Sequence, residues 1–473
     1  MNSELRRLPS VDRVLSEERI SQLQKVYPRA LLVELSRQYL QQVRLSIVAG
    51  NPCPSIDEVI ESICTQVRAL ENPSLRPIIN ATGIILHTNL GRASLGKEVL
   101  AAMDRVARGY CNLEFDLDSG VRGSRHAHIE PILCQLTGAE AALVVNNNAS
   151  AVLLGLTALT KRKEVIISRG QAIEIGGGFR IPDVMRQSGA KLVEVGTTNC
   201  TYAADYEQGI NSRTAAIIRV HSSNFRITGF THWVTLEELV SLGNDYDLPV
   251  FDDLGSGCFL DTTTLGLDPE LMVQQSVATG AGLVFFSGDK LVGGPQAGII
   301  VGKKQFIDKL KKHPLARVVR IDKIRLAGLV ATLIHYLKGE VVNKIPVWRM
   351  ISAPLEEIDQ RARLWAQALN GLGRVVEGET MIGGGSLPGG TLPTKLVAIG
   401  EEGKRKHQNT AQALSQRLRY HKAPIVGRIS GDVLLLDPRS VLPEEDEVVL
   451  QALQSVTVDW SIPNNRQSYK RGT

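Results

Sequence analysis

Two charged residues at the ends of apolar runs have the types and spacing for carbonyl chemistry. Lys290 lies in "FFSGDKLVGGPQAGIIVG" (285–302), and Asp253 ends the run "LPVFDDLG" (248–255), 37 residues earlier. A lysine amine is a nucleophile only when it is neutral, which requires burial or a cationic neighbour. Enzymes that use pyridoxal 5′-phosphate need a Schiff-base lysine and a carboxylate beside the pyridine nitrogen. Lys290 and Asp253 match this pair, although a surface lysine and an aspartate in a turn would also explain this sequence pattern.

The stretch "VVNNNASAVLLGL" (144–156) supplies a candidate phosphate site. An apolar run leads into Asn146, Asn147 and Asn148, and small residues then begin a helix. Backbone amides at a helix N-terminus bind phosphate readily, and Ser287 offers a hydroxyl to the same group. A capped turn would explain the asparagines by themselves. The three features together indicate pyridoxal 5′-phosphate and the large domain of the aspartate-aminotransferase-like fold (fold type I).

The elements that must position these residues are short β-rich runs separated by helix-length stretches. This alternation predicts an α/β domain from about residue 78 to 330, with a mostly parallel sheet and helices on both faces. Ligands of such sheets bind beyond the carboxyl ends of the strands, where the polar residues stand. The predicted strands are 141–147, 164–168, 190–196, 215–221, 248–255, 282–288 and 297–302.

Two further regions flank this domain. Residues 1–77 have the apolar periodicity of helices, and Ser55-x-x-Glu58 predicts a capping box at the start of one of them. Residues 331–473 mix helical patterns with short strands and predict a smaller α+β domain.

The composition is that of an ordinary soluble protein. Of the 473 residues, 43% are hydrophobic and 22% are charged, and the net charge of +5 permits an anionic partner without requiring one. The six cysteines show no metal-ligand spacing, so we expect no metal site and reduced thiols. We see neither a signal peptide nor a membrane span, and we expect a cytoplasmic protein.

Six stretches resemble a specific family, the bacterial selenocysteine synthases, or L-seryl-tRNA(Sec) selenium transferases. The resemblance covers nearly the whole chain, and it is most specific around Lys290 and in the fourth stretch below. The stretches are "HTNLGRA" (87–93), "VNNNAS" (145–150), "EVGTTN" (194–199), "SRGQAIEIGGGFRIPDVM" (168–185), "DDLGSG" (252–257) and "FSGDKLVGGPQAGIIVGKK" (286–304).

The resemblance implies a reaction and roles for several residues. Serine esterified to the selenocysteine tRNA would lose its β-hydroxyl to give a dehydroalanyl intermediate, and selenophosphate would supply selenium. Lys290 would hold the cofactor and remove the α-proton, with Asp253 at the ring nitrogen. Arg92, Arg317 and Arg320 would bind selenophosphate, a role that suits guanidinium groups, although Arg317 and Arg320 alone also fit a solvated surface.

Other polar residues have more than one interpretation. Arg122 and Arg125, on a glycine-rich stretch, either reach the 3′ end of the substrate or are solvated. His221 either contacts the cofactor or is a satisfied residue at a strand end. Gln171 and Glu174 follow a strand end, and either could face the ring.

The resemblance also implies partners. The helical N-terminal region would bind the tRNA, and its first 44 residues hold eight basic and five acidic residues, a net charge of about +3. The family resemblance implies a decamer built from dimers. The alternatives are a related lyase acting on a free amino acid or amino sugar acid, which would not need residues 1–77, and a non-catalytic tRNA-binding protein, against which Lys290 and Asp253 argue.

Overall fold

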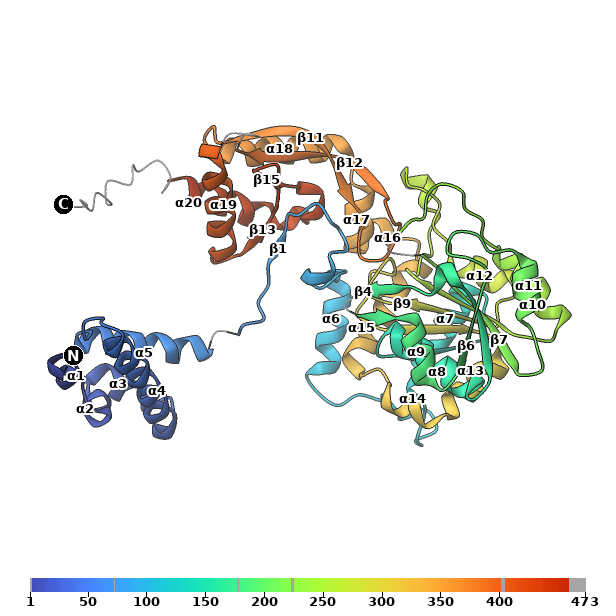
Figure 1. The fold of residues 1–473 in the computed structure, drawn as a ribbon, viewed down its shortest axis with the longest axis horizontal. Coiled ribbons are helices and arrows are strands. Elements are labelled where there is room, and N and C mark those ends of the chain that lie inside the picture. Colours follow the sequence, from blue (N-terminus) through green and yellow to red (C-terminus); the bar gives the residue numbers. More distant parts are fainter. Residues whose placement is uncertain (1, 72, 177, 223–224, 401–404, 459–473) are drawn as a thin grey trace. The chain divides into compact units, whose positions relative to one another are not determined.

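The chain forms two compact units, Met1–Pro77 and Ile78–Thr473 (Figure 1). The computed structural model describes residues 2–71, 73–176, 178–222, 225–400 and 405–458. Within these residues, no helix is both long enough and apolar enough to cross a membrane.

The N-terminal unit is a small helical bundle with its own apolar core. Val14, Ile20, Leu32 and Ile63 are buried in that core. The predicted capping box is confirmed, because the Glu58 amide donates to the Ser55 hydroxyl at 3.2 Å and the Ser55 amide donates to the Glu58 carboxylate at 2.7 Å. The helices are α1 (Asn2–Arg7), α2 (Val11–Ser16), α3 (Glu18–Leu23), α4 (Arg29–Val48) and α5 (Ile56–Glu71).

The second unit is built around a seven-stranded sheet in the order β2-β10-β9-β8-β7-β3-β6. Only β10 is antiparallel to its neighbours, and the other pairs are parallel. The predicted α/β fold with a mostly parallel sheet is therefore confirmed. The strands are β2 (Ala141–Val145), β3 (Glu164–Ser168), β6 (Lys191–Val195), β7 (Thr214–Val220), β8 (Val250–Gly255), β9 (Leu283–Ser287) and β10 (Gly298–Gly302).

Successive residues of each central strand enter two different apolar cores. In β3, Ile166 packs in one core with Leu133 and Leu239, whereas Val165 and Ile167 pack in the other. Side chains alternate between the faces of a strand, so a strand covered on both sides must be apolar throughout. This is why the strands could be recognised as continuous apolar runs.

Helices cover both faces of the sheet (Figure 1). One of them, α15, spans residues 330 and 331, where we predicted a domain boundary. The helices are α6 (Lys97–Ala107), α7 (Glu130–Thr137), α8 (Asn148–Thr160), α9 (Ile181–Ser188), α10 (Ala203–Gly209), α11 (Leu236–Asp245), α12 (Val273–Thr279), α13 (Lys304–Lys312), α14 (Pro314–Val318), α15 (Lys323–Leu337), α16 (Val341–Lys344) and α17 (Pro346–Ser352).

The C-terminal part contains an antiparallel sheet in the order β11-β12-β15-β14. Ile79 in β1 (Ile79–Asn80) pairs with Ile425 in β13 (Ile425–Val426), so the chain just after residue 77 joins this part. The division of the second unit at residue 330 stays a prediction. The other elements are α18 (Leu355–Ala368), β11 (Gly373–Met381), β12 (Thr391–Ile399), α19 (Arg405–Tyr420), β14 (Arg428–Ser430), β15 (Val433–Leu436) and α20 (Asp446–Val458).

Candidate active site

Lys290 follows β9 and is only 5% exposed. Its Nζ donates to the backbone carbonyl of Gly385 at 3.3 Å. Burial lowers the pKa of Lys290, and the positive charge of Arg92 acts in the same direction, while Asp253 opposes the shift. The amine is therefore more easily neutral than that of a surface lysine, as a nucleophilic lysine requires.

Asp253 lies in β8 and is 3% exposed. Burial raises its pKa to about 6, and the hydrogen bond from Asn148 and the charge of Lys290 oppose the rise. Asn148 Nδ2 donates to Asp253 Oδ1 at 2.8 Å, which fixes the carboxylate. A buried carboxylate of this kind gains more from a bound cation than an exposed one does, because water does not compete.

The asparagine turn between β2 and α8 lies against the same strand ends. Asn147 caps α8, since its Oδ1 accepts from the Ser150 amide at 2.9 Å. A β-carbon on Gly298 would lie 2.1 Å from the Asn147 carbonyl oxygen, so only glycine lets the turn approach β10 this closely. The turn thus presents the N-terminus of a 13-residue helix at the edge where Asp253 lies.

Several buried polar atoms around Lys290 have no hydrogen-bond partner among the described residues. A buried polar atom without a partner costs free energy, so this group fits a bound polar ligand. Pyridoxal 5′-phosphate suits the set, because a lysine, a buried carboxylate and a helix N-terminus match its aldehyde, its pyridine nitrogen and its phosphate. The atoms are Asn146 Oδ1, Asn148 Oδ1, Asp289 Oδ1 and Ser386 Oγ. Ser287, at the end of β9, is buried as well.

Of the three predicted selenophosphate ligands, Arg92 lies beside the lysine turn. Its Nη1 donates to Asp289 Oδ2 at 2.9 Å, and Asp289 precedes Lys290 in the chain. Its backbone φ of 63° is in the left-handed region, which a non-glycine residue seldom adopts. The backbone of the "HTNLGRA" segment therefore turns sharply where it meets the lysine.

Of the other two arginines, Arg317 lies in α14 and Arg320 follows that helix. Arg320 lies beside the asparagine turn, because its backbone bridges to Val145 and the Asn146 amide donates to the carbonyl of Val319. Its Nη1 is 3.8 Å from a Glu114 oxygen. Arg317 is exposed on α14, and among the described residues it has no hydrogen bond or ion pair to Lys290 or the asparagine turn.

The two arginines of the glycine-rich stretch differ from each other. Arg122 is exposed and lies 3.3 Å from Glu114. Arg125 is buried, and its guanidinium bonds to Glu114 and to the carbonyl of Ile321. Arg125 thus joins two segments and is not solvated, whereas Arg122 remains accessible.

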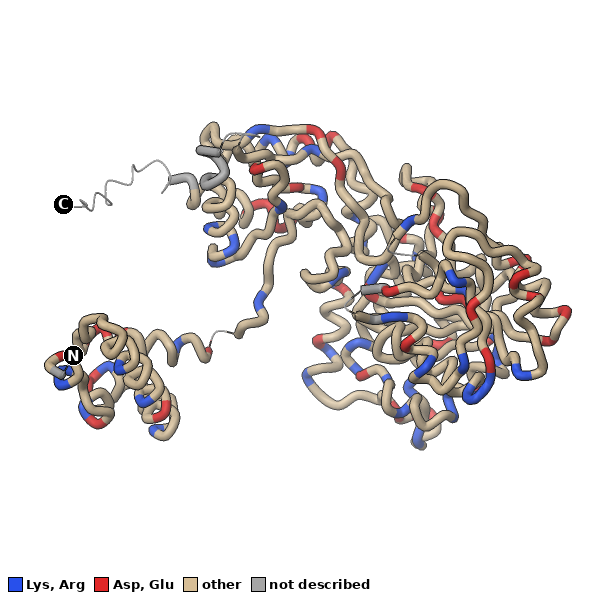
Figure 2. Tube along the Cα trace, viewed as in Figure 1, with Lys and Arg blue, Asp and Glu red and all other residues tan. Residues whose placement is uncertain are grey.

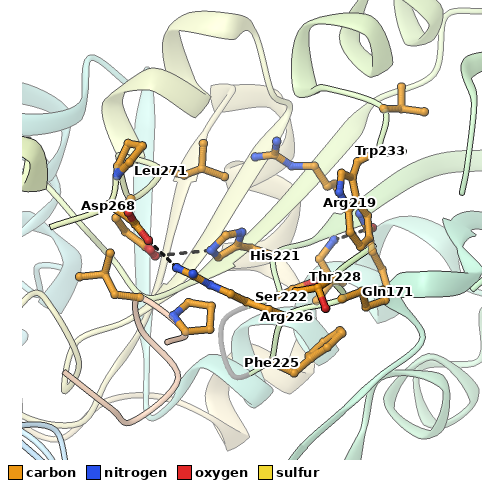
Figure 3. Close-up of a pocket in the computed structure, with 17 residues that line it drawn as sticks. Gln171, Arg219, His221, Ser222, Phe225, Arg226, Thr228, Trp233, Asp268 and Leu271 are labelled. Atoms are coloured by element: carbon orange, nitrogen blue, oxygen red, sulfur yellow. Dashed lines mark hydrogen bonds and ion pairs between the residues drawn. The ribbon is translucent and has the colours of Figure 1, made fainter. Parts of the chain in front are cut away.

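His221 begins the loop after β7 and lines a cavity of about 400 Å³ (Figure 3). Its backbone amide donates to the Asp253 carbonyl at 2.9 Å, so it follows the strand next to the aspartate. Its Nε2 is 3.5 Å from Glu270 Oε1. Burial acts to raise the pKa of Glu270, but several neighbouring groups, His221 foremost among them, together outweigh it and hold the pKa below its usual value.

Gln171 and Glu174 are placed differently. Gln171 lines the same cavity, and its Oε1 accepts from the Val220 amide at 3.0 Å. Glu174, in the hairpin β4 (Glu174–Gly176) and β5 (Phe179–Arg180), is exposed and pairs with Arg180 at 2.9 Å. Only Gln171 therefore lies beside His221.

Comparisons with known proteins identify the family. The family model described as L-seryl-tRNA selenium transferase matches residues 78–442, and the one described as selenocysteine synthase N terminal matches residues 5–44. The chain belongs to the L-seryl-tRNA selenium transferase family. The enzyme named L-seryl-tRNA(Sec) selenium transferase from Geobacter sulfurreducens is 46% identical over 464 residues, covering 95% of this chain and 98% of the relative. The one from Caldanaerobacter subterraneus is 46% identical over 457 residues, covering 96% and 98%.

A solved structure supports the fold of this selenium transferase family member. The D-glucosaminate-6-phosphate ammonia-lyase structure aligns with a TM-score of 0.57 at 21% identity, covering 83% of this chain and 98% of the lyase. At this identity the likeness concerns the fold alone.

Two features of the site in this selenium transferase family member were not predicted from the sequence. Glu270 is buried beside His221 but lies in "LDPELM", which carries no motif. The glycine-rich segment "GGGSLPGG" (383–390) supplies the carbonyl that accepts from Lys290. Its run of glycines was a visible signal of unusual backbone, and Gly383, Gly384 and Gly385 all have positive φ.

Proposed function

We propose that this protein converts serine carried on tRNA(Sec) into selenocysteine, with selenophosphate as the selenium donor. The α-proton and the β-hydroxyl of serine leave as water. The β-carbon then bonds to selenium while a proton returns to the α-carbon, and a second water cleaves the selenium–phosphorus bond and releases phosphate. We further propose that the reaction takes place in the cytoplasm.

Pyridoxal 5′-phosphate is the cofactor, and when bound it withdraws electrons from the α-carbon of the substrate. Lys290 would hold its aldehyde carbon, and the carboxylate of Asp253 would accept a hydrogen bond from its pyridine nitrogen. Asn146, Asn147, Asn148 and Ser287 would surround its phosphate, and His221 would flank the cofactor from β7. Burial supports these roles, since Lys290 and Asp253 are both at most 5% exposed.

Lys290 would also move the α-proton of the substrate. Its lowered pKa makes a neutral amine available to accept a proton at Nζ. The carbonyl of Gly385 accepts a hydrogen bond from Nζ and can hold the protonated amine near the α-carbon until the proton returns. Burial also excludes bulk water, which would otherwise take the proton.

Three arginines would bind the anionic donor, because a guanidinium group can grip two oxygens of a phosphate-like anion at once. Arg92, beside Asp289 and Lys290, and Arg320, beside the asparagine turn, approach the site from two directions. Arg317 is exposed three residues before Arg320, where its side chain is available to an anion.

The N-terminal unit would bind the body of the tRNA. It folds around its own core, and both signs of charge are spread over its helices (Figure 2). This fits recognition of RNA by shape together with a modest positive charge. We also propose a decamer built from dimers, on the family resemblance.

The observation that carries the proposal is a buried Lys290 beside a buried Asp253 in a chain that matches named selenium transferases over 95% of its length. A lyase acting on a free amino acid has less support, since the lyase structure is only 21% identical.

The test is to incubate the holoenzyme with seryl-tRNA(Sec) and selenophosphate, and then to hydrolyse the ester and identify the amino acid. We expect selenocysteine. Recovery of serine alone would reject the proposal.

A further inference from the structure

A cavity of about 400 Å³ adjoins the Lys290 site, and His221 is the one lining residue with a role given above (Figure 3). Its inner wall contains His221, whose amide bonds to the Asp253 carbonyl, and Glu270, whose charge acts on Lys290. Leu387, two residues after the carbonyl that accepts from Lys290, lines it too. The cavity is thus the immediate neighbour of the place where the seryl group must react.

The walls of the cavity combine aromatic, polar and basic side chains. Trp233, 39% exposed, and the half-buried Phe225 line it, and Thr228 adds a polar group. Arg226, which is exposed, pairs with Asp268 at 2.7 Å. Aromatic faces that stack on a base, together with a nearby cation for a phosphate, are the groups that bind the end of a single-stranded RNA.

We propose that this cavity binds the 3′-terminal nucleoside of the aminoacyl-tRNA substrate, with its base against Trp233 and its phosphate near Arg226. The proposal rests on the proposed function. The amino acid in such a substrate is an ester of the terminal ribose, so a seryl group at Lys290 places that nucleoside one ester linkage away. A free amino acid has no group that would fill a cavity of this size.

Two buried atoms at the inner end of the cavity support a ribose there. His221 Nε2 and Glu270 Oε1 face each other at 3.5 Å, and among the described residues neither has a closer hydrogen-bond partner. A ribose hydroxyl both donates and accepts, so it can supply a partner to each atom. The sugar would then lie between Lys290 and the base, as the ester linkage requires.

A small anion such as selenophosphate fits this cavity less well than a nucleoside does. Arg219 is held by Asp252 through two hydrogen bonds of 2.7 Å, and Arg226 is held by Asp268. Glu270 adds a buried negative charge to the wall. These acids oppose a compact polyanion but leave room for a neutral base and sugar with one phosphate at the mouth.

The experiment measures the affinity of the holoenzyme for two tRNA(Sec) transcripts, one ending in CCA and one lacking the terminal adenosine. We expect wild-type enzyme to bind the complete transcript about 5- to 150-fold more tightly, the range for one stacked base. Trp233→Ala should lose this preference and bind both transcripts alike, whereas Trp233→Phe should keep most of it because it retains a ring.

A wild-type enzyme that binds both transcripts equally would overturn the proposal, as would a Trp233→Ala variant with an unchanged preference. If Trp233→Ala fails to fold, Arg226→Ala replaces it, because Arg226 is exposed. Its affinity for the complete transcript should fall and the slope of affinity against salt should drop by about one, and an unchanged slope would also overturn the proposal. The same wild-type preparation is also assayed for elimination from seryl-tRNA(Sec), which distinguishes the proposed function from the proposed nucleoside site. A lack of elimination would reject the proposed function, whereas elimination without a preference for the complete transcript would reject this site alone.

Discussion

The Lys290 site and the N-terminal unit differ most clearly in the burial of their charged groups. Lys290 and Asp253 are at most 5% exposed, and each bonds to a fixed partner. In the N-terminal unit, Arg19 is 47% exposed even though it pairs with Asp57 and Glu61. Proton transfer needs desolvated groups with shifted pKa values, whereas contact with a polyanion needs charges at the surface. A mutation or deletion in one region should therefore impair that region's function and leave the function of the other region largely unchanged.

Lys290→Ala should have the largest effect. We expect elimination from seryl-tRNA(Sec) to fall at least about a thousandfold, because both the cofactor attachment and the base are lost. The absorbance of the cofactor bound to lysine should also disappear, while tRNA affinity stays within a few-fold of wild type. Lys303→Ala, an exposed lysine after β10, is the control. Retained elimination in Lys290→Ala would contradict the assignment.

Deletion of residues 1–77 should have the reciprocal effect. We expect the affinity for tRNA(Sec) to fall at least about a hundredfold, because one of two binding regions on the same chain is lost. Binding of the cofactor should be unchanged, since the deleted unit has its own core. Filter binding and cofactor absorbance measure the two properties, and an unchanged tRNA affinity would reject the role of the unit.

Asp253→Asn should stabilise the cofactor-free protein while it impairs activity. The pKa of Asp253 in the folded state is about 6, above its ordinary value of 3.8, so the folded protein holds this proton more tightly than the unfolded chain does. Ionisation of Asp253 therefore lowers the free energy of unfolding as the pH rises from 4 to 6. The asparagine of the variant does not ionise, so the variant does not lose this stability. Its free energy of unfolding should exceed that of wild type by about 3 kcal/mol at pH 7, and the difference should vanish near pH 4.

Urea unfolding at several pH values measures this difference, with Asp118→Asn, at an exposed aspartate, as the control. A difference that grows as the pH falls would show that Asp253 is stabilised as a carboxylate instead.

Arg317→Ala should separate the two halves of the reaction. We expect the use of selenophosphate to fall about tenfold, the effect of losing one charged hydrogen bond, while elimination is nearly unchanged. The rate of selenium incorporation at limiting selenophosphate measures it, with Lys312→Ala on the neighbouring helix α13 as the control. Slower elimination with normal use of selenophosphate would remove Arg317 from the donor site.

Ser55→Ala should have the smallest effect and should act on the N-terminal unit alone. Loss of the capping box should destabilise α5 by about 1 kcal/mol. Hydrogen exchange of the α5 amides should be about fivefold faster, while the sheet around Lys290 exchanges as in wild type. Ser21→Ala, an exposed residue of α3, is the control. Faster exchange in β8 would show that the two units are not independent.

The sequence predicted the sheet and its polar strand ends well, for a local reason. A strand buried on both faces is apolar throughout, and β8 and β9 show this up to the residues where Asp253 and Lys290 stand. The capping box at Ser55 is equally local, because its partners are three residues apart.

The features that the sequence did not predict depend on contacts between distant segments. The carbonyl of Gly385 is 95 residues from Lys290, and Ile79 pairs with Ile425 across most of the second unit. Arg125 looked like a loop residue, and only the fold shows its bond to the carbonyl of Ile321. The periodicity and spacing of residues in the sequence do not indicate such long-range pairs. For the same reason, the sequence did not predict that Glu270 is buried beside His221.

The central claim is that the buried lysine acts on an amino acid attached to tRNA. The most direct test incubates the wild-type holoenzyme, without a selenium donor, with seryl-tRNA(Sec) and separately with free serine, and measures pyruvate after hydrolysis as the product of β-hydroxyl loss. We predict pyruvate from the tRNA-linked serine and none from free serine. Pyruvate from free serine alone would contradict the account.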